Sequence, residues 1–354
     1  IYFGAIHRID LKNDSSFCRT LCKTIQIQTS WLERRLEYHL GVNHLFENAA
    51  ALAIIGCIFL GKDANRWRNR GLNLLNHEIT EQILPDGMHC ERSPMYHLRM
   101  FHVLNNVHLC FAAIGENKWE NVILSMQKAL NNILHPDEDI ALFNDSNFGV
   151  YPLQNKKYLP KKIIEGSWQL PSAGYFGYRG SNGEYIIVDA GAIGPDFNPG
   201  HAHGDIFSYE LSWQNRRIIV DSGNFDYESS DMRTYCRSTK AHNTVELDDK
   251  DQSDFWGTFR VGKRASPKEL NFKDSNNGFH LDGFHNGYRD HWGNAIHRRS
   301  IDYHTSQGLQ ITDSIESNKI VKAISRIHFH PDCQIINFNN QHLLITNCDV
   351  NCKI

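Results

Sequence analysis

The sequence lacks the features that would assign it at once to a membrane-spanning or nucleic-acid-binding class. Its longest apolar run covers residues 49–60, which is too short to cross a bilayer and predicts a buried helix. Lysine and arginine number 37 against 40 aspartates and glutamates, and the formal net charge of -3 argues against a general nucleic-acid binder. A locally basic groove for an acidic partner stays compatible with this balance, because electrostatic focusing depends on local charge.

The nine cysteines form no evident disulfide framework. No CxxC motif is present, and the odd count leaves at least one thiol unpaired. We therefore expect buried free thiols rather than a zinc site built from thiolates. No signal peptide is present, and because the chain begins at Ile1 rather than at methionine, we expect that a natural N-terminus has been removed.

What the chain does contain is typical of a soluble globular protein. Of its 354 residues 41% are hydrophobic and 22% are charged. This length can bury a large core and predicts two domains. The sequence contains no internal repeat and no low-complexity tract.

The first part of the chain has apolar residues at helical spacing and few prolines. Short connections between successive helices favour antiparallel neighbours, as in stacked helical hairpins. Five helices are expected, over residues 21–40, 43–60, 67–84, 94–113 and 119–134. Gly61 is a suitable stop for the second helix, and Ser93 with Pro94 suits the start of the fourth.

After about residue 140 the hydrophobic period shortens to that of strands. Many short strands with frequent turns indicate a large antiparallel sandwich. Strands are expected at residues 175–179, 185–189, 207–211, 216–220, 243–247, 278–283, 297–303, 308–312 and 325–329. The predicted organisation is an α+β multidomain chain with a helical domain at 1–140, a linker at 141–170 and a β domain at 171–354, and residues 155–162 are interpreted as a solvated part of the linker.

Imidazoles and a carboxylate come together in the second half. His201, His203, Asp221 and His242 belong to three segments that resemble strands or strand edges. Zinc binds histidine nitrogen and carboxylate oxygen in tetrahedral sets, and three protein ligands make a site. In an extended segment residues i and i+2 share a face, so His201 and His203 point the same way. One of them could bind metal while the other faces a substrate; the alternative is that these are separate polar residues on a sheet face.

A second polar cluster lies in the helical half. Asn43 and His44 begin a helix that is otherwise apolar, and residues 86–97 form a polar loop that runs into the next helix. Tyr96 falls in the first turn of that helix. A purely structural interpretation has Asn43 capping a helix, Glu91 pairing with Arg92 and Tyr96 packing, but the density of polar residues around Tyr96 favours a site.

Both clusters together resemble the heparinase II/III-type polysaccharide lyases. The helical half carries Asn43-His44 with Glu47-Asn48, Asp86-Gly87, Glu91-Arg92-Ser93-Pro94 and Tyr96-His97. The β half carries His201-Ala202-His203-Gly204-Asp205, Asp221-Ser222-Gly223, Arg237-Ser238-Thr239 and Ala241-His242-Asn243-Thr244. The resemblance covers about residues 20–330 and implies an incomplete α/α toroid followed by an antiparallel β-sandwich. The helical region is short for the family.

The resemblance also implies residue roles. Asn43 would neutralise the uronate carboxylate, Tyr96 would be the general acid and in some members also the base, and His201 would be a base or a charge stabiliser. Tyr235 would be a second candidate base. The implied substrate-binding residues are His44, Glu91, Arg92, His97 and Arg237. The implied ligands of a structural zinc ion are His203, Asp221 and His242.

These residue types suit β-elimination from a 4-linked uronic acid. Removal of the C5 proton creates an enolate-like charge on the carboxylate, which neighbouring hydrogen-bond donors stabilise most in the transition state. A base near C5 takes the proton, and an acid near O4 protonates the leaving group. A tyrosine base would need a pKa lowered by positive charge, for which Arg92, Arg237 and Lys240 are candidates.

Two other functions remain open at this point. A zinc-dependent glycan hydrolase would use the same histidines and aspartate to activate water, but it leaves Asn43 and Tyr96 without a role. A non-catalytic glycan-binding protein derived from a lyase is the other alternative. The expected partner is an acidic polysaccharide, with no nucleic acid and no membrane span, and the oligomeric state is not indicated. The resemblance implies a periplasmic or secreted protein, with which nine cysteines lacking a disulfide pattern agree poorly.

Overall fold

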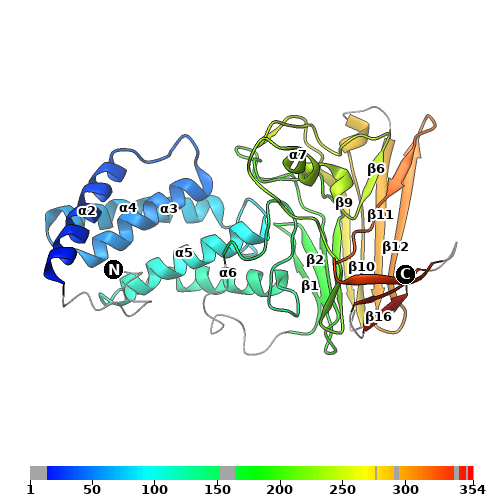
Figure 1. Cartoon of the computed structure of the whole chain (residues 1–354), viewed down its shortest axis with the longest axis horizontal. Helices are drawn as coiled ribbons and strands as arrows, with labels where there is room; N and C mark the ends of the chain where they lie inside the picture. Colours follow the sequence, from blue (N-terminus) through cyan, green and yellow to red (C-terminus); the bar gives the residue numbers. More distant parts are fainter. Residues whose placement is uncertain are drawn as a thin grey trace. The chain divides into compact units, whose positions relative to one another are not determined.

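The computed structural model describes residues 14–151, 164–275, 277–290, 295–338, 343–347 and 350–353. Helices come first along the chain and strands follow (Figure 1). The helices of the first part are α2 (Ser15–Glu33), α3 (Val42–Ile58), α4 (Lys62–Gln82), α5 (Pro94–Ala112) and α6 (Glu120–Ile133). All five predicted helices are present, and α5 has nearly the predicted bounds.

Contacts divide the chain into two compact units. The first runs to Thr80 and includes Val103–Trp119, and the second comprises Glu81–His102 and Glu120 onward. The start of α5 and all of α6 therefore belong to the same unit as the strands. The predicted boundary near residues 140–170 stays a prediction, and the predicted solvated linker at 155–162 lies outside the described residues.

Local signals explain the helices of the first unit. The Asp14 side chain accepts a hydrogen bond from the Phe17 amide at 2.8 Å and so caps α2. Glu33, near the end of α2, accepts hydrogen bonds from Arg66 (2.8 Å) and from the Trp67 indole (3.1 Å) on α4. A Cβ placed on Gly71 of α4 would lie 2.6 Å from the backbone oxygen of Ala49 on α3, so a glycine permits this close approach.

The start of α5 is built as the sequence predicts. Ser93 precedes the helix, its side-chain oxygen accepts from the Tyr96 amide at 3.4 Å, and its backbone carbonyl accepts from the His97 amide at 2.9 Å. The same hydroxyl donates to the backbone carbonyl of Asp145 at 2.7 Å. The cap thus also fixes the first turn of α5 to the chain segment that carries Asp145.

The β part consists of antiparallel sheets. A five-stranded sheet has the order β1 (Gly166–Leu170), β2 (Tyr175–Arg179), β3 (Tyr185–Asp189), β4 (Tyr209–Trp213) and β5 (Arg216–Ile219). A four-stranded sheet has the order β12 (Gly308–Ser317), β11 (Ala295–His304), β10 (Gly278–His285) and β9 (Pro267–Ser275). Smaller sheets pair β6 (Val245–Leu247) with β13 (Ala323–Ser325), β7 (Phe255–Trp256) with β8 (Arg260–Val261), and β15 (Leu343–Asn347) with β14 (Cys333–Phe338) and β16 (Val350–Lys353).

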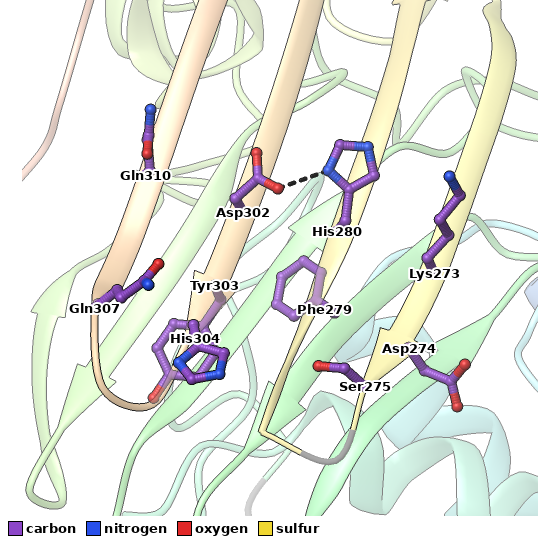
Figure 2. A pocket seen from close by; sticks show the side chains of 11 residues that line it. Lys273, Asp274, Ser275, Phe279, His280, Asp302, Tyr303, His304, Gln307 and Gln310 are labelled. Carbon is purple, nitrogen blue, oxygen red and sulfur yellow. Dashed lines mark hydrogen bonds and ion pairs between the residues drawn. The ribbon is translucent and has the colours of Figure 1, made fainter.

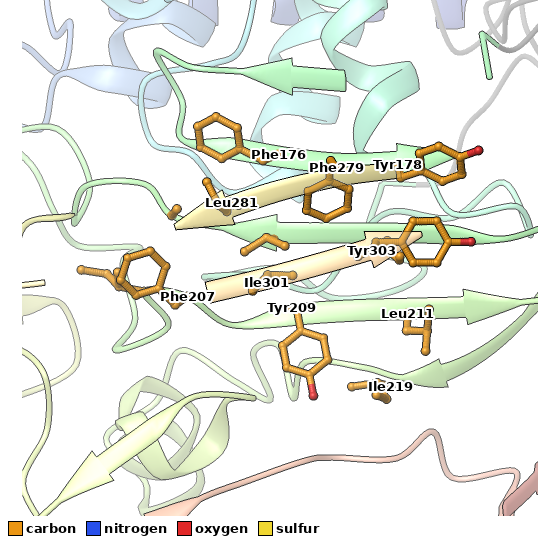
Figure 3. Close-up of a cluster of buried hydrophobic side chains, with 14 of the residues drawn as sticks. Phe176, Tyr178, Phe207, Tyr209, Leu211, Ile219, Phe279, Leu281, Ile301 and Tyr303 are labelled. Atoms are coloured by element: carbon orange, nitrogen blue, oxygen red, sulfur yellow. The ribbon is translucent and has the colours of Figure 1, made fainter. Parts of the chain in front are cut away.

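The main hydrophobic core lies between the two larger sheets. Figure 3 shows Phe176 and Tyr209 of the five-stranded sheet meeting Leu281, Ile301 and other side chains of the four-stranded sheet. These residues are almost completely buried. Alternation along β11 buries every second side chain, as the two-residue period of a strand requires, and two of these side chains, Ile301 and Tyr303, belong to this core.

Two further findings bear on the predictions. None of the helices in the described parts of the chain combines the length and the apolar character needed to cross a lipid bilayer. Cys22, Cys57, Cys110 and Cys236 carry free thiols, as expected from the absence of a disulfide pattern, but of these four only Cys236 is buried.

Candidate active site

One buried carboxylate organises the site. Asp145 binds the Nδ1 of His201 at 2.7 Å and the Nε2 of His203 at 2.8 Å. The guanidinium of Arg233 donates to both oxygens of the same carboxylate, at 2.9 Å for the pair Nη2 and Oδ2. Burial alone would raise the pKa of Asp145, but the hydrogen bonds from His201 and His203 outweigh it and hold the pKa far below its usual range.

The two histidines lie in an irregular loop, not in the strand that the pattern suggested. The loop connects β3 with β4, and its His201 and His203 rings converge on one carboxylate. The expectation that the two side chains point the same way thus agrees with the contacts, although its reason, an extended strand, does not apply. Asp145 was missed because it lies 56 residues from His201 in the stretch assigned to the linker.

Tyr96 lies directly against His201. The two rings stack with centroids 4.0 Å apart and an interplanar angle of 28°. The Tyr96 hydroxyl donates to the hydroxyl of Tyr227 at 3.2 Å. Burial and the neighbouring tyrosine raise the pKa of Tyr96, and burial likewise raises the pKa of Tyr227. Both phenols therefore hold their protons at neutral pH and can donate them.

Glu91 is a buried carboxylate on the other side of His201. One of its oxygens lies 3.6 Å from His201 Nε2 and the other lies 3.6 Å from His89 Nδ1, distances too long for hydrogen bonds. Neither oxygen has a hydrogen-bond partner among the described residues. Burial raises the pKa of Glu91 to about 7. For His201, burial opposes the charged form, but Glu91 and Asp145 outweigh it and raise the pKa of the imidazole.

The predicted zinc ligands form a hydrogen-bonded pair and a neighbouring imidazole. His242 Nδ1 lies 2.9 Å from Asp221 Oδ2, and the His242 and His203 rings have centroids 5.4 Å apart. Within the described residues, no three His, Cys, Asp or Glu side chains are grouped as ligands of one metal ion. Yet His203 Nδ1 and His242 Nε2 are buried without a hydrogen-bond partner among those residues. These two imidazole nitrogens fit the donor chemistry of zinc, and both oxygens of Asp221 face His242 Nδ1.

Three residues expected to bind substrate make side-chain hydrogen bonds within the protein. The Arg92 guanidinium donates to the backbone carbonyls of Ala173 (3.1 Å) and Gly194 (2.8 Å). The ring of His97 is fully buried, with Nε2 at 2.9 Å from the Met126 carbonyl and Nδ1 accepting from the His89 amide.

Arg237 is the third of these residues and is also buried. Its guanidinium donates to the carbonyls of Gly257 (3.1 Å) and Arg260 (3.2 Å). Burial lowers its pKa to about 10. These contacts give Arg237 a structural task, and its contact with substrate stays a prediction.

The tyrosine whose hydroxyl meets that of Tyr96 is Tyr227, whereas the predicted role of Tyr235 stays a prediction. Tyr235 lies in the short helix α7 (Asp231–Arg237), where the Lys240 ammonium lies 5.8 Å from the centre of its ring. Tyr227 precedes that helix and contacts Tyr96. Ser230 caps α7 by accepting from the Arg233 amide, and the capping signal separates the two tyrosines into a loop and a helix.

Asn43 and His44 belong to the first unit. Asn43 is buried in the first turn of α3, and its side-chain oxygen has no hydrogen-bond partner among the described residues. His44 is half exposed, and its Nδ1 lies 3.5 Å from Glu37.

A groove on the β part lies away from these groups. A groove of about 330 Å³ crosses the outer face of the four-stranded sheet, where Lys273, His280, Asp302 and Gln310 form a row across the strands (Figure 2). The His280 and Asp302 side chains are hydrogen-bonded at 2.7 Å. None of the predicted site residues lines it, so the chemistry around Tyr96 is assigned from the side chains and not from this groove.

Comparison with known families agrees with the paired clusters. The family profile described as "Heparinase II/III-like, C-terminal" matches residues 164–350, and that described as "Heparinase II/III N-terminus" matches residues 12–162. The chain belongs to the heparinase II/III family. The resemblance predicted from the sequence is thereby confirmed.

Relatives within this family carry the name heparin-sulfate lyase. The chain is 28% identical over 222 residues to the one from Pedobacter heparinus, covering 53% of this chain and 33% of the relative. It is 26% identical over 284 residues to the one from Bacteroides stercoris, covering 68% of this chain and 42% of the relative. The chain thus spans less than half of the length of these relatives.

Solved structures of the family share the fold. A crystal structure of heparinase III superposes with a TM-score of 0.76 at 18% identity, covering 95% of this chain and 58% of that one. The heparan sulfate lyase from Pedobacter heparinus superposes with a TM-score of 0.68 at 20% identity, covering 93% and 56%. Helices followed by antiparallel sheets are therefore the architecture common to these proteins and this chain.

Proposed function

We propose that this chain is the catalytic part of a polysaccharide lyase that cleaves a uronic-acid-containing polysaccharide by β-elimination. The observation that carries the proposal is the stack of Tyr96 on His201, with the imidazole held by Asp145 and the phenol bonded to Tyr227. This arrangement places a proton donor and an imidazole side by side in a family whose relatives are named heparin-sulfate lyases. A heparan-sulfate-like polymer is accordingly the first substrate to test.

The two groups divide the proton transfers of an elimination. The C5 proton passes to His201, the electron pair of the C–H bond forms the C4–C5 double bond, and the bond from C4 to the leaving oxygen breaks. Tyr96 protonates that oxygen, since its raised pKa keeps the phenol protonated until negative charge develops beside it. Asp145 fixes the tautomer and orientation of His201 through Nδ1 and leaves Nε2 for the substrate.

Asn43 and Tyr227 complete the proposal. The Asn43 amide would neutralise the uronate carboxylate, where charge grows in the transition state. Its support is a buried side-chain amide whose oxygen has no hydrogen-bond partner among the described residues. Tyr227 takes the part that the sequence assigned to Tyr235, because its hydroxyl lies within hydrogen-bond distance of Tyr96.

The finer architecture is part of the same proposal. We assign the helical part to an incomplete α/α toroid and the two larger sheets to an antiparallel β-sandwich. The core shared by β2 to β5 with β10 and β11 supports the second assignment. The periplasmic or secreted location implied by the resemblance stays a prediction.

Ultraviolet absorbance during incubation with uronic-acid polysaccharides tests the reaction. The panel contains heparan sulfate, heparin, hyaluronan, chondroitin and alginate, and each new C4–C5 double bond adds absorbance. The Tyr96→Phe variant keeps the ring stack and loses the proton, so its rate should fall by at least about a hundredfold. Tyr38→Phe, at a tyrosine 58% exposed in the first unit, is the matched control and should keep full activity. Equal rates for wild type and Tyr96→Phe would contradict the assignment.

A zinc ion held by His203, Asp221 and His242 is the second element of the proposal. Bound there, zinc would supply a structural tie between three segments of the β part, and elimination itself needs no metal-activated water. The purified protein should contain about one zinc per chain by elemental analysis. Replacing His242 by Gln should lower that content and the melting temperature together, whereas His280→Gln on the outer sheet face should change neither. If wild-type protein stripped of metal melts at the same temperature as wild-type protein supplied with zinc, the assignment is wrong.

A further inference from the structure

Two exposed aromatic rings lie next to His201. Tyr227 and Phe259 are 38% and 45% exposed, and their rings are nearly parallel, with centroids 5.9 Å apart and an interplanar angle of 17°. Each ring stands edge-on to His201, at 6.1 Å and 84° for Tyr227 and at 6.2 Å and 82° for Phe259. The reacting imidazole therefore has an aromatic wall beside it.

A buried arginine supports this wall from within. The guanidinium carbon of Arg233 lies 5.3 Å from the centre of the Tyr227 ring and 5.3 Å from that of Phe259. The same guanidinium donates to Asp145, which holds His201. Cation–π contact and the shared carboxylate thus connect both rings to the imidazole through one charged network.

The loop that carries Phe259 is fastened by backbone hydrogen bonds. Phe259 lies in the turn between β7 and β8, and Arg233 Nε donates to the Thr258 carbonyl at 3.0 Å. Arg237 donates to the carbonyls of Gly257 and Arg260 on either side of it. Two completely buried guanidinium groups therefore hold one short hairpin, and the exposed ring at its tip has little freedom left to lose when it binds a ligand.

We propose that Phe259, with Tyr227, is a platform on which a pyranose ring of the polysaccharide stacks beside the sugar that reacts. The inference rests on the proposed lyase function. A pyranose has an apolar face of C–H groups, and binding sites combine such aromatic surface with a few polar groups that fix orientation. Isolated exposed aromatics are common, but this ring is held in place and borders the reacting imidazole. Phe259 is accordingly a specificity-determining residue. Arg237 is a positioning residue, because its hydrogen bonds to the backbone hold the hairpin that carries Phe259.

The kinetic test compares Phe259→Ala with wild type on the polymer that is cleaved. Loss of the stacking surface should raise KM roughly three- to tenfold and change kcat less than about twofold, because the ring takes no part in the proton transfers. Phe259→Trp should restore KM. The control is Trp256→Ala, in the same hairpin with 51% exposure, whose ring packs on Arg260 at 4.5 Å and should leave KM unchanged.

A binding assay separates failure of this inference from failure of the lyase proposal. Wild type and Tyr96→Phe, each with and without Phe259→Ala, are run in native gels that contain heparan sulfate, heparin or hyaluronan. If wild type eliminates and Phe259→Ala has an unchanged KM, the platform is wrong and the lyase stands. If no polymer is eliminated, weaker retardation of the Phe259→Ala protein still supports the platform. Equal retardation, or no retardation of wild type, overturns it.

Discussion

Asp145 is the residue on which the candidate site depends. Its carboxylate holds His201, His203 and Arg233 at once, so one buried charge orients the imidazole of the proposed reaction and a proposed metal ligand. A buried carboxylate with this many donors is stable as an anion, whereas Glu91, on the opposite side of His201, has no hydrogen-bond donor among the residues that the structure describes. The different surroundings of the two carboxylates, and not their residue types, give them different pKa values.

Glu91 should lower the stability of the folded protein at neutral pH, because its buried carboxylate has no hydrogen-bond donor among the described residues. Its pKa of about 7 in the folded protein lies above the ordinary value, so the unfolded chain releases the proton first as pH rises. The folded state therefore loses stability between about pH 4.5 and 7, by on the order of 3 kcal/mol, and the loss is complete above that range. Glu91→Gln should raise the free energy of unfolding near pH 8, and the gain should shrink toward pH 4.5. Urea unfolding at a series of pH values measures it.

The groups that face Glu91 define the control. His89, His201, Asp145 and Arg99 are the titratable or charged side chains that act on it. Glu33 is also buried but accepts hydrogen bonds from Arg66 and Trp67, which lower its pKa despite burial. Glu33→Gln should therefore destabilise the protein at neutral pH. If Glu91→Gln and Glu33→Gln change the free energy of unfolding in the same direction, hydrogen-bond pairing does not distinguish these two carboxylates.

At the scale of elements, close helix packing depends on glycine. Gly71 on α4 lies so near α3 that a Cβ would approach the Ala53 amide nitrogen to 2.5 Å. Alanine has the better helix propensity by about 1 kcal/mol, but separating two packed helices costs about 1–3 kcal/mol. Gly71→Ala should lower the free energy of unfolding of the first unit, as measured by thermal or urea denaturation.

The neighbouring position on the same helix provides the comparison. Asn73 is exposed, so Asn73→Ala should follow propensity alone and stabilise the helix slightly. If Gly71→Ala stabilises the protein as much as Asn73→Ala does, the close approach of α3 and α4 is not a packing constraint.

At the scale of the whole molecule, buried histidines should make the protein sensitive to acid. Burial lowers the pKa of His97 to about 4 and that of His89 to about 3, and it lowers the pKa of His135 as well. These rings stay neutral in the folded state, while the unfolded chain binds protons below about pH 6.5. The folded state therefore has its full stability above about pH 6.5 and loses stability as the pH falls toward 4, because protons bind to these histidines only in the unfolded chain. For His97 and His89 the loss of folding free energy should be roughly 2 kcal/mol each between about pH 7.5 and 5.

Comparing variants isolates the contribution of one ring. His97→Gln removes the titrating group, so its unfolding free energy should change less with pH than that of wild type, by roughly 2 kcal/mol over the same range. Gln310→Ala, on the outer sheet face, removes no titrating group and should leave the pH dependence as it is in wild type. If the unfolding free energies of wild type and His97→Gln change equally with pH, the buried His97 ring does not cause the acid sensitivity.

Local sequence determined the elements of this protein. The cap at Ser93 with Pro94 predicts α5 to within one residue, and the strand predicted at residues 175–179 coincides with β2. Helix caps, hydrophobic period and turns act over a few residues, so they can be read without the rest of the chain. The paired motifs also sufficed to place the chain in its family.

Tertiary structure alone decided which side chains meet. Tyr96 and Tyr227 are 131 residues apart in the chain, and Arg233 and Asp145 are 88 apart. No local pattern distinguishes Tyr227 from Tyr235, or an arginine that holds backbone carbonyls from one that binds substrate. Those choices depend on which segments pack together and on how much water their packing removes, and both are properties of the folded chain.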